Sequence, residues 1–480
     1  MAGILNGFLN PFRSAGRVNR VLLGTFTLIN GLVLINACLH DPRVGYDAGN
    51  HLKYVQTLAT FRLPAFSDSR EFFSPPLPYV FPAMLVAIGS VELWWAAKLA
   101  QLLNVALSVG LTFYLVKTCD LVGPGKLHLK IVSLGLLGLL PVYYRTFAYV
   151  RGEPFVAFFA VFAVYQLLTV FLKDQENWAR IATIGLAMGL MGLSRQWAFT
   201  LFPAILLFAG LLAKFGRRVG LFLRLAVVSL SISLAVAGWF YLHLLVDYGT
   251  AAAFNKEPSP RFSFTNQPAD FYFGLGWPQL FQWPIRSSFP NQFVPIFYSE
   301  IWGDYWGYFA VYGKDTRTGD FIPATHLEAI ASEDPPPEWL ETNRRPMGAY
   351  LGRVNLVSLF PTAIALGGLG LGVAQLVGFV RRRSVAGEAI AISFFALLIV
   401  TSLAGYFWFL VMYPSIGKGD TIKATYQLHI FPFVAILAGE LLERLRQKSA
   451  GGYTAIIGGL AIVFVHNLPA MITHFVRFRP

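Results

Sequence analysis

Long apolar runs separated by short basic segments limit the folds open to this chain. A transmembrane helix needs about 20 mostly apolar residues. The sequence has 480 residues, a mean hydropathy of +0.56 and only 13% charged residues, a composition that excludes a soluble protein of this length. We therefore predict an all-α polytopic membrane protein with about 11 transmembrane helices. The predicted spans are 21–39, 94–116, 131–149, 154–172, 181–193, 197–212, 225–246, 352–378, 388–412, 424–442 and 453–473.

Basic clusters between these runs predict the topology. The net charge of +13 does not indicate nucleic acid here, because most Lys and Arg residues occupy short loops, as is typical of a cytoplasmic face. The segment 77–92 is short and contains Pro78 and Pro82, so we expect it to lie in the interface or to re-enter. The N-terminus is then cytoplasmic, and one face receives Arg13/Arg17/Arg20, Lys117/Lys126/Lys130, Lys173/Arg180, Arg217/Arg218/Arg224, Arg381/Arg382/Arg383 and Arg444/Arg446/Lys448.

The opposite face receives the unusual polar and aromatic segments. These are 46–80, 143–154, 193–197, a long loop at 248–350, and 417–427. The long loop is rich in Trp, Tyr, Phe and Pro, and this aromatic content argues against disorder. We predict an N-terminal transmembrane module (1–247) with a first external loop (40–93), an external cap (248–351) and a C-terminal transmembrane module (352–480). External juxtamembrane helices are expected in the first loop.

Asp47 is the first candidate for chemistry. In a short helix that begins near residue 48, Asp47, His51 and Tyr54 share one face at spacings i, i+4 and i+7. A carboxylate held at the membrane surface could act as a general base on a hydroxyl, with His51 orienting it. The alternative is that Asp47 is merely solvated or caps that helix.

Arg151, Glu153 and Arg195 form the second group of candidates. Arg195 and Gln196 lie between two apolar runs with almost no loop. An arginine at that depth usually has a partner or a ligand, and the alternative is that it reaches back to the interface. The alternative for Arg151 and Glu153 is a mutual surface ion pair, which contributes little to stability.

Two further groups lie in external segments. Lys418, Lys423 and Tyr426 precede an apolar helix, and external lysines there indicate an anionic ligand such as a lipid phosphate; ordinary headgroup contact is the alternative. Trp302, Tyr305 and Trp306 in "SEIWGDYWGYF" (299–309) are spaced as one helical face. Such a face could pack against sugar rings or could anchor the loop at the interface.

Metal and disulfide sites are not indicated. The sequence has no CxxC motif or Cys/His cluster, and no compact cluster of acids. Cys38 is predicted to lie at the external face of the membrane and Cys119 at the cytoplasmic face, so the two cannot form a disulfide. A divalent metal is possible but not indicated.

Several of these segments resemble the GT-C-fold glycosyltransferases. The similarity is greatest to the group that contains protein O-mannosyltransferases and the aminoarabinose transferase of lipid A. The first loop of that group resembles "YDAGNHLKYVQTLA" (46–59) followed by "FFSPPLPY" (72–79). Its later external turns resemble "VRGEPFVAFF" (150–159), "GLSRQWAFTLFPA" (192–204) and "IKATYQLHIFPFVAILAG" (422–439).

The resemblance implies transfer of a sugar, with inversion, from a polyprenyl-phosphate-linked donor to an acceptor glycan, lipid or protein. It implies Asp47 as the base and external Arg and Lys residues as the clamp on the lipid phosphate. The group often has a second acid after the first, where this chain has Ala48, and a basic residue before the Pro-Pro step, where this chain has Ser74. The clamp then falls to Arg195, Lys423 or Lys98. The expected location is a bacterial plasma (inner) membrane, with an extracytoplasmic active site surrounded by membrane lipids.

Three other functions are compatible with a chain of this class. A transporter or flippase of lipid-linked glycans would place charges at mid-membrane, often in two related halves. A glycan polymerase or ligase would share the external arginines but would not need an acid in the first loop. A non-catalytic subunit of a membrane complex is the third possibility.

Overall fold

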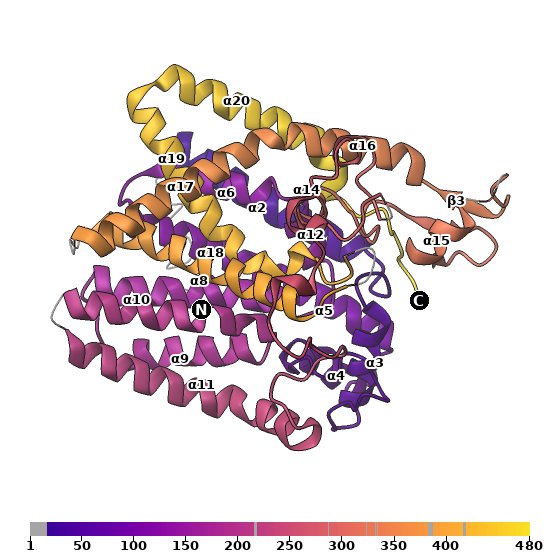
Figure 1. Cartoon of the computed structure of the whole chain (residues 1–480), viewed down its shortest axis with the longest axis horizontal. Coiled ribbons are helices and arrows are strands. Elements are labelled where there is room, and N and C mark those ends of the chain that lie inside the picture. Colours follow the sequence, from indigo (N-terminus) through magenta and orange to yellow (C-terminus); the bar gives the residue numbers. More distant parts are fainter. Residues whose placement is uncertain are drawn as a thin grey trace.

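The computed structural model describes residues 17–215, 218–286, 288–322, 324–331, 333, 335–382, 387–415 and 419–480. The chain is almost entirely helical, and the long helices run roughly along the long axis of the molecule (Figure 1). They are α2 (Arg17–Leu39), α5 (Leu93–Val122), α6 (Leu127–Gly138), α7 (Pro141–Phe147), α8 (Glu153–Leu172), α9 (Trp178–Gly192), α10 (Phe202–Phe215), α11 (Val219–Tyr248), α17 (Leu359–Arg382), α18 (Gly387–Met412), α19 (Phe431–Lys448) and α20 (Ala450–Asn467). The described residues also contain the 3₁₀ helices η2 (Gln196–Thr200), η3 (Phe264–Asn266), η4 (Ala424–Ile430) and η5 (Leu468–Met471). The prediction of an all-α polytopic membrane protein is confirmed.

The number of spans depends on how bent and short helices are counted. Among the described residues, 8 helices are long and apolar enough to cross a membrane, or 9 if the pair α6 and α7, bent by 69°, forms one span. The predicted span 181–193 corresponds to α9, a shorter apolar helix, and the predicted span 424–442 corresponds to η4 followed by α19. Eleven spans therefore remain a prediction.

Basic side chains at one end of the bundle pair with acids from other helices. Lys126 contacts Glu388 at 2.9 Å and Glu440 at 3.2 Å, and Arg444 contacts the same two carboxylates. These residues come from the turn after α5, the start of α18 and the middle of α19. The structure thus joins members of separate predicted cytoplasmic clusters, whereas Arg13, Arg217 and Arg383 lie outside the described residues.

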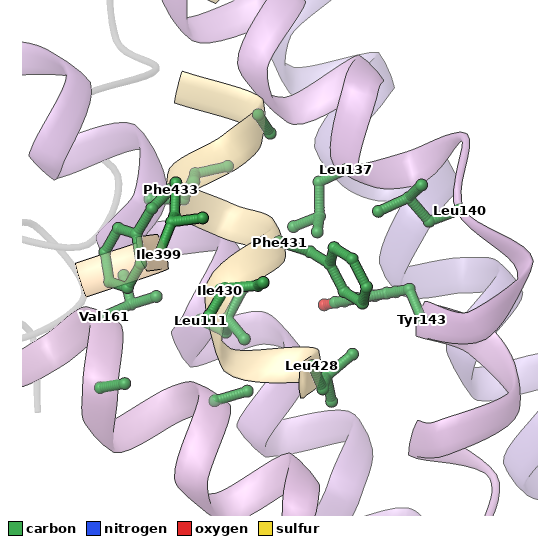
Figure 2. Packing of buried hydrophobic residues seen from close by; sticks show 14 of the residues in the cluster. Leu111, Leu137, Leu140, Tyr143, Val161, Ile399, Leu428, Ile430, Phe431 and Phe433 are labelled. Carbon is green, nitrogen blue, oxygen red and sulfur yellow. The ribbon is translucent and has the colours of Figure 1, made fainter. Parts of the chain in front are cut away.

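The core forms where η4 and α19 insert between other spans. Figure 2 shows Leu428, Ile430, Phe431 and Phe433 of this segment packed against side chains of the surrounding helices. Those neighbours are Leu111, Leu137, Leu140, Tyr143, Val161 and Ile399. The core fixes the segment that begins at Lys423, so the position of this external residue is determined by packing inside the bundle.

Small residues allow two helix pairs to approach closely. A methyl group added at Gly368 of α17 would lie 2.5 Å from the backbone nitrogen of Ala438 in α19, and one added at Gly185 of α9 would lie 2.7 Å from Ser229 Cα in α11. Close packing through small residues is the usual way in which helices associate in lipid. The helices α9, α10 and α11 accordingly lie side by side along one edge of the bundle (Figure 1).

The segment predicted as the first external loop contains two short helices, α3 (Ala48–Leu58) and α4 (Leu77–Ala87), at one end of the bundle (Figure 1). An 11-residue helix such as α4 is about 16 Å long, which is too short to cross a bilayer alone. Helix α4 begins directly after Pro76, and its first amide, of Leu77, donates to the carbonyl of Leu193 at 3.0 Å. The loop is thereby fixed to the turn that carries Arg195.

The cap contains short helices and one small sheet. The helices are α12 (Ala269–Phe273), α13 (Gln279–Gln282), α14 (Phe293–Trp302), α15 (Ala324–Ile330) and α16 (Arg344–Val357). The strands β1 (Gly313–Asp315), β2 (Phe321–Ile322) and β3 (Leu340–Thr342) form an antiparallel sheet in the order β2-β1-β3, with Gly313 opposite both Ile322 and Thr342.

The C-terminal segment joins the cap to the first loop. The amide of Asp41 donates to the carbonyl of Phe475 at 2.9 Å, and the amide of Arg477 donates to that of Leu39 at 3.0 Å. The Arg477 guanidinium also contacts Asp320 at 3.2 Å. The first loop, the cap and the C-terminus therefore occupy the same end of the molecule, as the topology predicts.

Candidate active site

Asp47 forms an ion pair with a residue from the other end of the sequence. It directly precedes α3 in a left-handed conformation with φ 55°, and its side chain makes no capping hydrogen bond. Its Oδ2 instead accepts from Lys423 Nζ at 3.2 Å. The Asp47 side chain is 43% exposed, whereas that of Lys423 is 11% exposed. The Lys423 ammonium holds the pKa of the Asp47 carboxyl well below its usual range, so Asp47 is ionised and available to solvent.

Aromatic rings surround the Lys423 ammonium. Its Nζ lies 5.1 Å from the ring centre of Tyr46, 5.8 Å from that of Trp306 and 5.8 Å from that of Tyr426. The Arg151 guanidinium lies over two of the same rings, at 5.4 Å from Tyr46 and 5.7 Å from Tyr426. Aromatic faces stabilise cations, so the rings of Tyr46 and Tyr426, which both cations share, help to hold two positive charges close together.

A chain of buried ion pairs continues inward from Arg151. Its guanidinium contacts both carboxylate oxygens of Glu153, at 2.6 and 2.9 Å. Glu153 contacts Arg195 at 3.1 Å, and Arg195 contacts Glu71 at 2.9 Å and donates to the Ser74 hydroxyl. We call Arg151, Glu153, Arg195 and Glu71 the charge ladder. All four side chains are buried, so each charge depends on its neighbours for stabilisation.

Glu71 ends the charge ladder in the first loop. Burial opposes ionisation of Glu71, but the Arg195 guanidinium, His51 and the Ser74 hydroxyl together outweigh burial, and the pKa of Glu71 lies below its ordinary value. Its carboxylate also accepts from the Ser74 hydroxyl at 2.5 Å. Arg195 thus ties the turn after α9 to the loop before the Pro-Pro step. Ser74, which stands where a basic residue is often found in the resembling group, serves as a contact for Arg195.

The side chains of His51 and Tyr54 both contact Tyr79. His51 Nδ1 lies 2.7 Å from the Tyr79 hydroxyl, and the Tyr54 ring stacks on Tyr79 at 4.3 Å. Burial lowers the pKa of His51 to about 4, so it is neutral at physiological pH. Asp47 directly precedes the first helical residue with a left-handed backbone. That His51 and Tyr54 orient Asp47 or bind sugar hydroxyls stays a prediction.

Gln196 and Trp197 link the first loop, the cap and the residues around Lys423. Gln196 Nε2 donates to the carbonyl of Phe73 at 3.2 Å and to that of Ala253 at 3.3 Å. The neighbouring Trp197 ring lies 4.8 Å from the ring of Tyr426. These two residues therefore stand between the aromatic rings at Lys423 and the space described next.

A large apolar cavity begins at Gln196 and Trp197. It has a volume of about 650 Å³ and lies between η2, α10, α11 and α18, with residues 251–254 of the cap at its border. Its walls include Phe199, Leu234, Tyr241, Trp408 and Phe409. The cavity thus places an apolar compartment next to the cationic residues.

The predicted aromatic face at 302–306 does not form. Helix α14 ends at Trp302, and Gly303 has an extended backbone that turns the chain. Trp302 donates through Nε1 to Thr362 at 2.9 Å, inside the bundle, and Tyr305 stacks on Phe289. Trp306 alone of the three contacts Lys423, and its Nε1 donates to the carbonyl of Ile422 at 3.1 Å.

A second buried network was not predicted from the sequence. The Tyr46 hydroxyl donates to Glu300, which also contacts Arg145 at 3.0 Å. Burial raises the pKa of Glu300 to about 7 despite the opposing effect of Arg145. Arg145 and Glu300 both lie in segments singled out as external, but an isolated Arg and Glu 155 residues apart give no sequence signal that they meet. This network fixes Tyr46, and hence Asp47, to the cap.

Among the described residues, no group of three or more His, Cys, Asp or Glu side chains is arranged to hold a metal ion.

Two other lysines were candidates for the phosphate clamp or its surroundings. Lys418, which the sequence places near Lys423, lies outside the described residues. Lys98 caps the end of α2, since its ammonium donates to the carbonyls of Ala37 and His40 at 2.9 and 2.7 Å.

Comparison with protein-family models finds no match, and comparison with curated proteins finds none either. Solved structures give matches. The apo form of ArnT from Cupriavidus metallidurans, an aminoarabinose transferase, has 14% identity and a TM-score of 0.44, over 92% of this chain and 62% of that one. The form of ArnT bound to undecaprenyl phosphate has 14% identity and a TM-score of 0.45, over 93% and 64%.

The archaeal oligosaccharyltransferase AglB from Archaeoglobus fulgidus, in complex with an inhibitory peptide and a dolichol-phosphate, also matches. It has 13% identity and a TM-score of 0.46, over 94% of this chain and 56% of that one. Both proteins are GT-C-fold membrane glycosyltransferases, the kind that the sequence resemblance names. This chain spans less than two thirds of the length of each of them, and the likeness assigns no role to any residue here.

Proposed function

We propose that this protein is a membrane glycosyltransferase that uses a polyprenyl-phosphate-linked sugar as its donor, on the extracytoplasmic face, with inversion and with Asp47 as general base. The observation that supports the proposal is the position of the Asp47–Lys423 pair. A half-exposed carboxylate and a cation lie at the end of the bundle, and Tyr426 and Trp197 lead from them to the apolar cavity of about 650 Å³. Transfer from a lipid-linked phosphate donor needs a carboxylate for the acceptor, a cation for the phosphate and an apolar compartment for the lipid.

Lys423 and Arg151 are the groups proposed to bind the donor phosphate. Asp47 is the carboxylate that pairs with Lys423 among the described residues, and Arg151 Nη1 is a buried donor without a hydrogen-bond partner there. The guanidinium of Arg195 is, by contrast, paired with two carboxylates. Phosphate is a better leaving group when cations stabilise its developing charge. Of the three clamp residues that the resemblance implies, Arg195, Lys423 and Lys98, the proposal keeps Lys423, and it adds Arg151.

Asp47 is proposed to remove the proton of the acceptor hydroxyl. In a single displacement the acceptor oxygen bonds to the anomeric carbon, the bond from that carbon to the phosphate oxygen breaks, and the proton passes to Asp47. The polyprenyl phosphate leaves with its charge held by Lys423 and Arg151, and the configuration inverts. While Lys423 pairs with Asp47, the carboxylate is a weak base; when a phosphate engages Lys423, Asp47 regains basicity. Donor binding would thus activate the base.

The apolar cavity is proposed to hold the first part of the polyprenyl chain. Its volume is within the range of about 300–1,000 Å³ usual for small-molecule sites. It lies between spans, so a chain anchored in the bilayer could enter it while the phosphate reaches Lys423. A nucleotide sugar has no lipid chain that could occupy this apolar cavity.

Binding of a polyprenyl phosphate to the full-length protein in detergent tests this function. Native mass spectrometry can compare the polyprenyl phosphate with the polyprenyl alcohol of the same length. We expect the phosphate to bind at least tenfold more tightly, since charge-assisted contacts are worth about 1.5–3 kcal/mol. Equal binding of phosphate and alcohol, or preferential binding of a nucleotide sugar, would refute the proposed donor class.

A further inference from the structure

We propose that the cap segment from Phe262 to Pro278, called here the aromatic rim, is embedded in the outer boundary of the bilayer and contacts lipid directly. The sequence of the aromatic rim is "FSFTNQPADFYFGLGWP", in which the only charged side chain is Asp270. The carboxylate of Asp270 accepts from Gln292 at 2.7 Å. The proposal concerns how the cap meets the membrane and does not depend on the proposed catalytic activity.

Large apolar side chains of the aromatic rim are exposed. The exposed fraction is 81% for Phe273, 64% for Leu275 and 73% for Trp277. These values are similar to those of Leu242 and Val246, which are 60% and 74% exposed on the spanning helix α11. Monomeric proteins in water rarely leave such a group of apolar side chains uncovered. A lipid-facing surface does so as a rule.

Side-chain amides fix the position of the aromatic rim against α18. Asn266 and Gln267 donate to the carbonyls of Val411 and Leu410 at 3.2 and 2.7 Å. The rings of Phe271 and Tyr272 lie 6.1 and 5.8 Å from the ring of Phe407, one turn further into the helix. The rim thus runs beside the last turns of α18.

The last turns of α18 coincide with the edge of the hydrocarbon core. At the opposite end of this helix, Glu388 pairs with Lys126 and Arg444, which marks the other membrane boundary. Crossing the core takes about 20 residues, and this distance from Glu388 leads to Trp408. The aromatic rim beside residues 407–411 therefore lies where Trp and Phe side chains anchor membrane proteins.

The aromatic rim is less charged than the rest of the cap. Residues 313–345 carry the small sheet and many charges, among them the exposed pair Arg317 and Asp315. That part resembles an ordinary surface in water. The cap is thus expected to have one half in the lipid boundary and the other half in solution.

Nitroxide labels in vesicle-reconstituted protein test this inference. In a Cys38→Ala background, where the remaining Cys119 is buried, labels at Phe273→Cys and Trp277→Cys are compared with a lipid-facing control, Leu242→Cys, and a control in the sheet turn, Thr318→Cys. We expect both rim labels to collide with oxygen more often than with a water-soluble nickel complex, as at Leu242. Collision rates like those at Thr318 would mean that the rim stands in water. Low rates for both reagents would mean that protein covers it. Either result would overturn the proposal.

A measurement without labels guards against disturbance by the cysteine variants. Lipids brominated near the headgroup end of the acyl chain should quench a component of tryptophan emission in the wild-type protein that is absent from Trp277→Phe. Phenylalanine keeps the apolar character of the position, so the variant should fold normally. Identical quenching of the two proteins would place Trp277 outside the bilayer and contradict the proposal.

Discussion

The Asp47–Lys423 pair and the charge ladder are built from the same residue types but occupy different environments. Asp47 is half-exposed and has one charged partner, whereas Arg195 is buried between Glu153 and Glu71. The Asp47–Lys423 pair can open at lower cost than a buried pair, because water reaches the Asp47 carboxylate. A fully buried pair cannot, because the remaining charge would be left without stabilisation. We infer that the Asp47–Lys423 pair serves chemistry and that Arg195, Glu153 and Glu71 hold the first loop in place.

The largest effect is expected from Arg195→Gln. This change leaves Glu71 and Glu153 with less compensation inside the protein, and breaking a buried pair costs about 3–5 kcal/mol. Thermal unfolding in detergent should shift to a clearly lower temperature, with loss of expressed protein. The control is Arg62→Gln, which breaks an exposed pair with Asp68 in the same loop and should have almost no effect. A stable Arg195→Gln protein with weakened donor binding would restore Arg195 as a phosphate ligand.

Lys423→Gln should show the opposite pattern. We expect thermal stability close to that of the wild type, because Asp47 is exposed, and an affinity for polyprenyl phosphate that is lower by roughly tenfold or more. The control is Lys53→Gln, an exposed lysine of α3 in the same loop. Native mass spectrometry measures both affinities. Unchanged affinity in Lys423→Gln would remove this residue from the donor site.

Tyr46→Phe removes the hydroxyl of Tyr46 and keeps its ring, so it tests the contribution of the hydroxyl alone. The ring that faces Lys423 and Arg151 remains, while Glu300 loses a hydrogen bond worth about 1.5–3 kcal/mol. The unfolding temperature should fall and the affinity for polyprenyl phosphate should stay the same. Tyr312→Phe is the matched control, since it removes an exposed hydrogen bond to Glu341. If both variants unfold like the wild type, the contact between the first loop and the cap contributes nothing to stability.

The smallest expected effect is a change in the pH dependence of folding stability, which depends on His51. The pKa of His51 is about 4 in the folded protein and 6.5 ordinarily, so the unfolded chain takes up a proton first as the pH falls. The stability that neutral His51 provides is present above pH 6.5 and is lost as the pH falls below it, by about 1 kcal/mol between pH 7.5 and 5.5. The wild type should lose more thermal stability over this interval than His51→Gln. His326→Gln, at an exposed position, should behave like the wild type; equal losses in all three proteins would show that His51 titrates normally.

Much of the fold could be predicted from the sequence, because long apolar runs and basic loops are strong local signals. Contacts between distant residues could not. The pairing of Asp47 with Lys423 joins residues 376 positions apart, and it depends on how η4 packs into the bundle. Nor does periodicity reveal that Asp47 has a left-handed backbone directly before the helix. The same holds for Trp302 and Trp306, which Gly303 separates.

The central claim is that Asp47 is the base, and Asp47→Asn tests it most directly. This change keeps the size of the side chain and removes its basicity. We expect the rate of sugar transfer in reconstituted vesicles to fall by about 10²–10⁴, while polyprenyl phosphate binds as tightly as before or more tightly, because Lys423 is free. Asp68→Asn, in the same loop, should transfer at the wild-type rate. Near-normal transfer by Asp47→Asn would contradict the account.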